Sequence, residues 1–247
     1  MFSRKPSISK WLTGVAIVLS GTLSGATLAQ EHDPRVLLNR MSAEIAGLKS
    51  FVLSGDAYAD ARLDAGQIIE HSSQVTMRVR QPDAMYMTHR TSEDVKELHF
   101  DSGILTVYTK SRNFYAQKAG PEDIDAAVDF AINEIGIDAP MLDFLTRNVA
   151  EDLLAGASEV QYLGTSLIRG KIFEHVAIRS AEVDVQIWIA SEGPPLPGKM
   201  AISAKWEGGA PRTVIFMHWD TNPDIPDGSL SFVPPEGATK ISFLSKP

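Results

Sequence analysis

Most of the chain alternates apolar and polar residues with a period of two, which is the pattern of a β-strand with one buried face. Val75, Met77 and Val79, for example, are each followed by a polar residue. The pattern predicts about ten or eleven strands. They span 51–60, 67–80, 85–90, 95–100, 104–109, 113–117, 162–168, 172–179, 183–190, 199–206 and 213–221, and a further short strand is predicted near 240–244. Because short turns join most of them, we expect antiparallel hairpins.

Two regions instead repeat apolar residues every three or four positions, as an amphipathic helix does. The first helix is predicted from Pro34 to Leu48, with Asp33 as its N-cap. The second region lies between the two runs of strands. It predicts a helix over 120–136, a short helix over 139–147 and one further turn at 150–154. The helices therefore form a small part of a chain that is mainly β.

The predicted sheet has too many strands to remain flat, because strand twist makes a long sheet curl. One concave face must then be covered, and the predicted helices are available to cover it. We therefore predict a mainly β fold with helices, of the α+β class. Its sheet is a curved antiparallel half-barrel covered by the N-terminal helix and the inserted helical pair.

Large apolar residues face inward in this arrangement, and methionine is prominent among them. Methionine repacks easily around irregular ligands, so one interpretation is a cavity that accommodates a lipid. The other is a filled core beneath the helices. For the cavity, the predicted wall residues are Met85, Met87, Met200, Ile202, Met217 and Trp219, and the predicted lid residues are Leu37, Met41, Val128 and Phe144.

The first 29 residues have the features of a secretory signal peptide. Arg4, Lys5 and Lys10 precede a short apolar run that ends in small residues at Ala26 and Ala29. This run is too short for a good membrane span, which needs about 20 apolar residues. We therefore expect cleavage after residue 29 and an exported protein without an integral membrane span, with residues 30–247 forming one half-barrel domain.

Composition narrows the chemistry that the protein can perform. Removal of the three basic residues in the signal segment would change the net charge from -8 to -11. An acidic chain without a basic stripe is a poor candidate for nucleic acid binding. The chain contains no cysteine, which excludes disulfides, thiolate metal sites and thiol nucleophiles. We expect no cofactor.

No common hydrolase or nucleotide-binding motif occurs in the sequence, so we expect no catalytic residues and no enzyme activity. His89 and His99 could meet across neighbouring strands, where Glu97 could complete a metal site. A metal-dependent enzyme is therefore a weaker alternative. The simpler interpretation is that these are ordinary polar strand residues without a metal.

Three stretches carry a family resemblance: Leu196–Met200, Thr213–Trp219 and the tail Ser231–Ala238. With the order of the elements, they make the chain similar to a family of predicted periplasmic proteins, domain of unknown function 2092, with the fold of the lipoprotein carriers LolA and LolB. The resemblance implies a periplasmic location and a lipid or lipoprotein acyl chain as ligand. It also implies an arginine that holds the lid closed, for which Arg78 and Arg90 are candidates.

The sequence thus supports three hypotheses. The first is a non-catalytic periplasmic protein that binds or carries a lipid or acyl chain. The second is a module that binds an envelope protein partner and holds no ligand. The third is the metal-dependent enzyme with a site around His89, His99 and Glu97.

Overall fold

A computed structural model describes residues 32–135, 137, 141–146, 148–205 and 211–243. The predicted signal peptide, residues 1–29, lies outside the described residues. So does Trp206, the last residue of one predicted strand. Within the described part, no helix has both the length and the apolar character that a membrane span requires.

The strand pattern of the sequence is reproduced closely by the structure. In the part of the chain that the structure describes, six strands precede the inserted helices and five follow them, and a last short strand lies near the C-terminus. The strands are β1 (Ser50–Arg62), β2 (Ile68–Arg80), β3 (Ala84–Arg90), β4 (Val95–Asp101), β5 (Ile104–Thr109), β6 (Phe114–Ala119), β7 (Glu159–Ile168), β8 (Lys171–Arg179), β9 (Val183–Ala190), β10 (Pro197–Ala204), β11 (Arg212–Asp220) and β12 (Thr239–Ile241).

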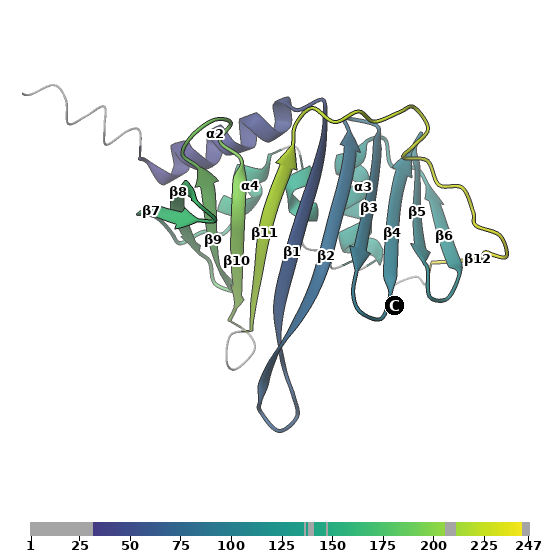
Figure 1. Cartoon of the computed structure of the whole chain (residues 1–247), viewed down its shortest axis with the longest axis horizontal. Helices are drawn as coiled ribbons and strands as arrows, with labels where there is room; N and C mark the ends of the chain where they lie inside the picture. Colours follow the sequence, from purple (N-terminus) through teal and green to yellow (C-terminus); the bar gives the residue numbers. More distant parts are fainter. Residues whose placement is uncertain (1–31, 136, 138–140, 147, 206–210, 244–247) are drawn as a thin grey trace, which may run out of the picture.

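All twelve strands of the described residues form one open, curved sheet, which confirms the predicted half-barrel (Figure 1). Their order is β12-β6-β5-β4-β3-β2-β1-β11-β10-β9-β8-β7. The sheet therefore consists of two antiparallel meanders that join where β1 pairs with β11. Among the described strands, only β12 differs from the antiparallel prediction, because it pairs with β6 in parallel.

The helical segments between β6 and β7 differ most from the prediction. Helix α2 spans Pro34–Gly47 and is capped by Asp33, whose carboxylate accepts hydrogen bonds from the Arg35 and Val36 amides. The predicted helix at 120–136 is an α-helix, α3, only over Ile124–Phe130, and a π-helix, η1, continues over Ala131–Ile135. A 3₁₀ turn, η2 (Leu142–Leu145), lies in the region predicted as a helix at 139–147, of which residues 139, 140 and 147 lie outside the described residues. The further turn predicted at 150–154 is a short helix, α4, that spans Val149–Leu154.

Helix α2 runs along one end of the sheet, and the helical segments between β6 and β7 lie behind the sheet in the view of Figure 1. We call the end near α2 the upper end. Between these segments and the upper half of the concave face lies a continuous apolar core. Phe51, Leu53, Met77, Phe100 and Phe144 are examples of fully buried residues in it. Burial of such side chains contributes about 1.5–3 kcal/mol each.

The C-terminal tail crosses the opposite, convex face. Phe232 contacts the rings of His99, Tyr108 and Tyr115 at centroid distances of 5.1–5.7 Å. His99 Nδ1 donates a hydrogen bond to the Leu230 carbonyl oxygen at 3.0 Å. The tail stretch that carries the family resemblance therefore packs an aromatic side chain against the outside of the sheet, which is a structural role.

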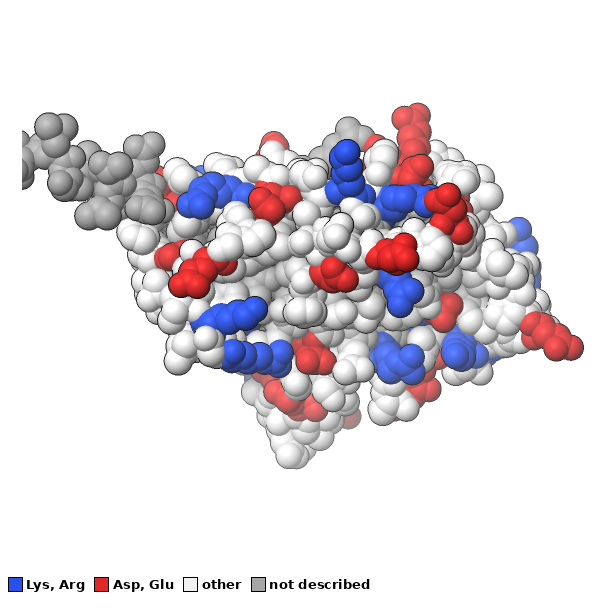
Figure 2. Space-filling view, turned by 45° about the horizontal axis from the view of Figure 1, so that its top comes forward, with Lys and Arg blue, Asp and Glu red and all other residues white. Residues whose placement is uncertain are grey.

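Charged residues are distributed without strong segregation on the face shown in Figure 2. Lysine and arginine side chains lie among aspartate and glutamate side chains across this face. Such mixing is typical of a solubilising surface rather than a strongly attractive field.

Candidate functional site

The concave face changes character along its strands. On β1, the inward-facing residues decrease in size from Phe51 and Leu53 to Ala57 and Ala59. On β2, the inward series changes from Val79, Met77 and Val75 to Ser73 and His71 as it leaves α2. Small and polar side chains cannot fill the space that large apolar ones fill in the upper half. The lower half of the concave face is consequently hollow.

The hollow is a cavity of about 810 Å³, which we call the central cavity. Its volume lies in the range of about 300–1,000 Å³ that is usual for ligand pockets. Its lining residues are Ala57, Ala59, His71, Ser72, Ser73, His89, Thr91, Ser92, Glu93, Ile132, Ile137, Met141, Asp143, Met200, Ile202, Ala204, Pro211, Thr213 and Ile215.

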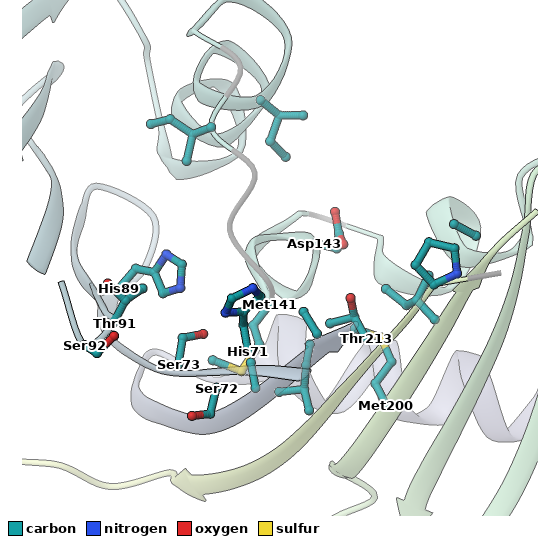
Figure 3. A pocket seen from close by; sticks show the side chains of 18 of the residues that line it. His71, Ser72, Ser73, His89, Thr91, Ser92, Met141, Asp143, Met200 and Thr213 are labelled. Atoms are coloured by element: carbon teal, nitrogen blue, oxygen red, sulfur yellow. The ribbon is translucent and has the colours of Figure 1, made fainter. Parts of the chain in front are cut away.

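Apolar and polar side chains occupy different walls of the central cavity. The wall formed by β10, β11 and η1 contributes Met200, Ile202, Ile215 and Ile132. The wall formed by β2, β3 and the following turn is rich in hydroxyl and imidazole groups. Figure 3 shows this division, with His89, Thr91 and Ser92 on one side and Met200 and Thr213 on the other. The cavity is therefore amphipathic.

Burial indicates where the central cavity opens. Met141, Met200 and Ile215 are at most 2% exposed and form its floor. His71, Thr91, Ser92 and Glu93 are exposed to solvent. The opening is thus on the polar side, next to the β1–β2 hairpin.

Two smaller cavities extend the central one in opposite directions. The first, of about 300 Å³, shares Asp143, Met200 and Ile202 with it and is otherwise mostly apolar. We call it the apolar annex, and its other lining residues are Val149, Asp152, Leu153, Ala155, Ile178, Ser180, Val183 and Val185. The second, of about 560 Å³, shares His89, Thr91 and Glu93, and we call it the polar groove. Its other lining residues are Asp94, Lys96, Thr109 and Arg112.

Met141 separates the filled half of the concave face from the central cavity. Its backbone has φ of 80°, a left-handed conformation that is uncommon outside glycine. Its side chain lies against Gly55 of β1, where a Cβ atom would be 2.6 Å from the Met141 sulfur. The absence of a side chain at Gly55 therefore lets Met141 approach the sheet closely.

The structure distributes the predicted site residues between the core and the cavity. Of the six predicted wall residues, Met200 and Ile202 line both the central cavity and the apolar annex. The other four, Met85, Met87, Met217 and Trp219, pack in or against the filled core. The four predicted lid residues, Leu37, Met41, Val128 and Phe144, are buried in that same core. Most of the predicted residues thus lie above the cavity.

The sequence did not predict the polar wall of the cavity or its lining residues Ile132, Ile137 and Met141. His71, Ser73 and His89 occupy positions that alternation assigns to the inner face, but a polar residue at such a position does not by itself indicate a cavity. A sequence signal for the cavity does exist: on the inner face, large apolar side chains are lost toward one end of each strand. Met141 and Ile137 could not be placed because they lie in irregular segments.

The proposed meeting of His89 and His99 is wrong. His89 lies opposite Lys96, whereas His99 lies opposite Tyr86, so the two histidines face opposite sides of the sheet. His99 and Glu97 share the convex face as alternation predicts, and their side chains are 3.3 Å apart. Burial, followed by the nearby Glu97 carboxylate, raises the pKa of Tyr86 beside them. Among the described residues, no three histidine or acidic side chains form a group that could hold a metal ion.

The two arginine candidates for holding a lid are also on the wrong face. Arg78 lies opposite Tyr86, and Arg90 lies opposite Gln74, in positions that alternate with the buried residues of β2 and β3. Both are therefore on the convex side, away from the helices.

In comparisons with known proteins, the chain matches one family model and is similar to several solved structures at low sequence identity. No curated protein matches the chain. Among solved structures, lipoprotein LppX of Mycobacterium tuberculosis is similar at 13% identity and a TM-score of 0.46, over 78% of this chain and 100% of that one. A LolA superfamily protein from Nitrosomonas europaea is similar at 10% identity and a TM-score of 0.40, over 81% of this chain and 97% of that one.

A third similar structure is a complex of MucA and MucB from Pseudomonas aeruginosa. The likeness has 12% identity and a TM-score of 0.45, and it covers 81% of this chain and 61% of that one. A family model described as "Predicted periplasmic protein (DUF2092)" matches residues 35–244. This match confirms both the family that the sequence motifs predicted and the predicted periplasmic location. The chain belongs to the DUF2092 family of predicted periplasmic proteins.

Proposed function

We propose that this protein is a non-catalytic periplasmic carrier whose central cavity and apolar annex hold an acyl chain. In this proposal the functional unit is the half-barrel of residues 30–247, after removal of residues 1–29. The observation that supports it is the amphipathic cavity of about 810 Å³ beneath an otherwise filled half-barrel.

The geometry of the cavity suits a flexible apolar chain. Met200 and Ile202 belong to both the central cavity and the apolar annex, so one chain could lie along them from one space into the other. Burial of each methylene group contributes about 0.8 kcal/mol, and the opening near His71 leaves a path for entry. Met200 and Met141 have unbranched side chains that can adjust to the shape of the ligand.

Two measurements on the full-length mature protein test this proposal. Native mass spectrometry of protein purified from the periplasm is expected to release an amphiphile upon activation. After removal of bound lipid, titration with cis-parinaric acid, a fluorescent fatty acid, is expected to saturate at about one molecule per chain. Protein that carries no amphiphile and does not bind the fatty acid would contradict the proposal.

A second candidate function is binding of an envelope protein at the edge strand β7. No described strand pairs with the outer edge of β7. Leu167 is 71% exposed, and Leu163 and Ile172 are also exposed nearby. Exposed strand edges are common sites for adding a strand from a partner. A photoreactive residue at position 167 is expected to crosslink one envelope protein in cells, whereas the same residue at Leu63, on the β1–β2 hairpin, should not.

A further inference from the structure

We propose that the polar groove is a subsite for the phosphate-bearing headgroup of an amphiphile. The inference rests on the proposed function, because the acyl chain of the same molecule would occupy the central cavity. The proposed ligand is therefore a phosphorylated lipid, whereas the central cavity alone would fit any apolar chain.

The three cavities form a gradient of polarity. The apolar annex joins the central cavity through Met200 and Ile202, and the central cavity joins the polar groove through His89 and Thr91. An amphiphile matches this order, with its chain at one end and its headgroup at the other. A purely apolar ligand would leave the groove without a role.

Strand register explains how the groove arises. Met87, Leu98 and Val107 lie side by side across β3, β4 and β5 and belong to or pack against the core. Two residues further along these strands, His89, Lys96 and Thr109 lie side by side in the same way. The inner face therefore changes within one step from an apolar row to a row that carries an imidazole, an ammonium and a hydroxyl group.

Lys96 and Arg112 supply positive charge to the groove. Among the described residues, neither side chain has a carboxylate within ion-pair distance of 4.0 Å. A guanidinium and an ammonium group together are a common recognition set for phosphate oxygens. Thr109, which lies opposite Lys96, offers a further hydrogen-bond donor.

The two acidic residues of the groove differ in what they do. Asp94 accepts hydrogen bonds from the Val95 and Ser111 amides at 2.7 and 3.0 Å, so its carboxylate holds the turn. Against desolvation, these hydrogen bonds and the charge of Lys96 lower the pKa of Asp94, so Asp94 offsets part of the Lys96 charge. The Glu93 amide donates to the Thr91 hydroxyl, while the Glu93 side chain is exposed at the border of the central cavity. Glu93 would repel a bound phosphate. Its replacement by an uncharged residue should therefore strengthen binding of a phosphate group, whereas replacement of Lys96 and Arg112 should weaken it.

The experiment compares two lipids with the same chain in competition with cis-parinaric acid. The probes are 1-oleoyl lysophosphatidic acid and 1-oleoylglycerol, both below their critical micelle concentrations. The readout is the ratio of their inhibition constants within each variant, which cancels any change in the affinity of the fluorescent acid. We expect the phosphorylated lipid to bind at least about tenfold more tightly in the wild type, as charge-assisted hydrogen bonds would provide.

The double variant Lys96→Gln/Arg112→Gln is expected to remove this preference while keeping the affinity for 1-oleoylglycerol. The matched control Lys110→Gln/Lys171→Gln removes the same charge from exposed positions outside the groove and should keep the preference. Glu93→Gln should increase the preference about two- to threefold by removing a like charge.

Three results would overturn the inference in distinguishable ways. If both lipids displace the acid equally and the double variant changes nothing, the carrier function holds and the headgroup subsite is wrong. If neither lipid displaces the acid and the acid itself does not bind, the proposed function fails. If calorimetry shows inorganic phosphate binding as tightly as the phosphorylated lipid, the groove is a site for free phosphate rather than for a headgroup.

Discussion

The upper and lower halves of the concave face use the same strands for different purposes. In the upper half, Leu53 of β1 and Met77 of β2 are buried in a continuous core. In the lower half, the same strands present Ala57, Ser73 and neighbouring small or polar residues around the central cavity. The upper half stabilises the fold, and the lower half leaves a cavity of a size usual for ligand pockets.

The difference shows that one strand can serve both purposes if its inner residues change along its length. The change is abrupt, because inward-facing residues recur every second position, about 6.6–6.8 Å along the strand. On β3, for instance, buried Met87 is followed on the same face by His89. Mutations in the two halves should therefore separate stability from binding.

The largest expected effect is on stability in the upper half. Met77→Ala removes a fully buried side chain and leaves a void, which should lower the free energy of unfolding by about 3 kcal/mol. Ile202→Ala truncates a partly buried residue at an existing cavity, so its cost should be about 1 kcal/mol. Urea denaturation monitored by tryptophan fluorescence measures both. Equal costs would contradict the distinction between the halves.

The next effect comes from occupying the lower half. At a free concentration of cis-parinaric acid about 100 times its Kd, the folded state should gain about 2.7 kcal/mol. Urea denaturation with and without the fatty acid measures this gain. A filled lower half would show no gain, since the ligand would have no space to enter.

A smaller effect is expected on the convex face. Phe232→Ala removes three aromatic contacts of the tail and should cost about 1–2 kcal/mol of stability. Its affinity for cis-parinaric acid should equal that of the wild type, because Phe232 lies on the other side of the sheet. A loss of affinity in a folded Phe232→Ala variant would place part of the ligand site outside the concave face.

The smallest effect concerns a phenol that packs against the upper core. Burial, followed by a 2.6 Å hydrogen bond to Glu174, raises the pKa of Tyr162 from 10.0 to about 12. The folded state therefore favours the neutral phenol. The resulting stabilisation is complete below pH 10 and is lost as the pH rises toward 12. Absorbance titration at alkaline pH should show less late-forming phenolate in Tyr162→Phe than in the wild type. If the variant instead lost phenolate that forms near pH 10, the pKa of Tyr162 would not be raised.

The fold was largely predictable because alternation and turns are local properties of the sequence. The hairpin signal at Asp101-Ser102-Gly103 and the N-cap at Asp33 both correspond to observed boundaries. The helices between β6 and β7 were less predictable, since the chain changes from α to π geometry at Ala131. Local periodicity cannot distinguish these two helix types.

The site was only partly predictable for a different reason. Alternation identifies which residues face inward, but it does not show which of them the helices cover. Met85 and Met200 have the same pattern in sequence, yet only Met200 lines the cavity. The position of the helices depends on contacts between distant segments, such as the hydrogen bond between Ser42 of α2 and Asn148 next to α4.

The most direct test of the account fills the cavity with one side chain. Ala59 lines the central cavity, whereas Ala61 lies two residues further along β1 and does not line it. Ala59→Phe is expected to weaken binding of cis-parinaric acid by at least about tenfold, a loss comparable to that of two buried methylene groups. Ala61→Phe should bind the fatty acid as the wild type does. Equal binding by both folded variants would contradict the claim that the lower half of the concave face holds the ligand.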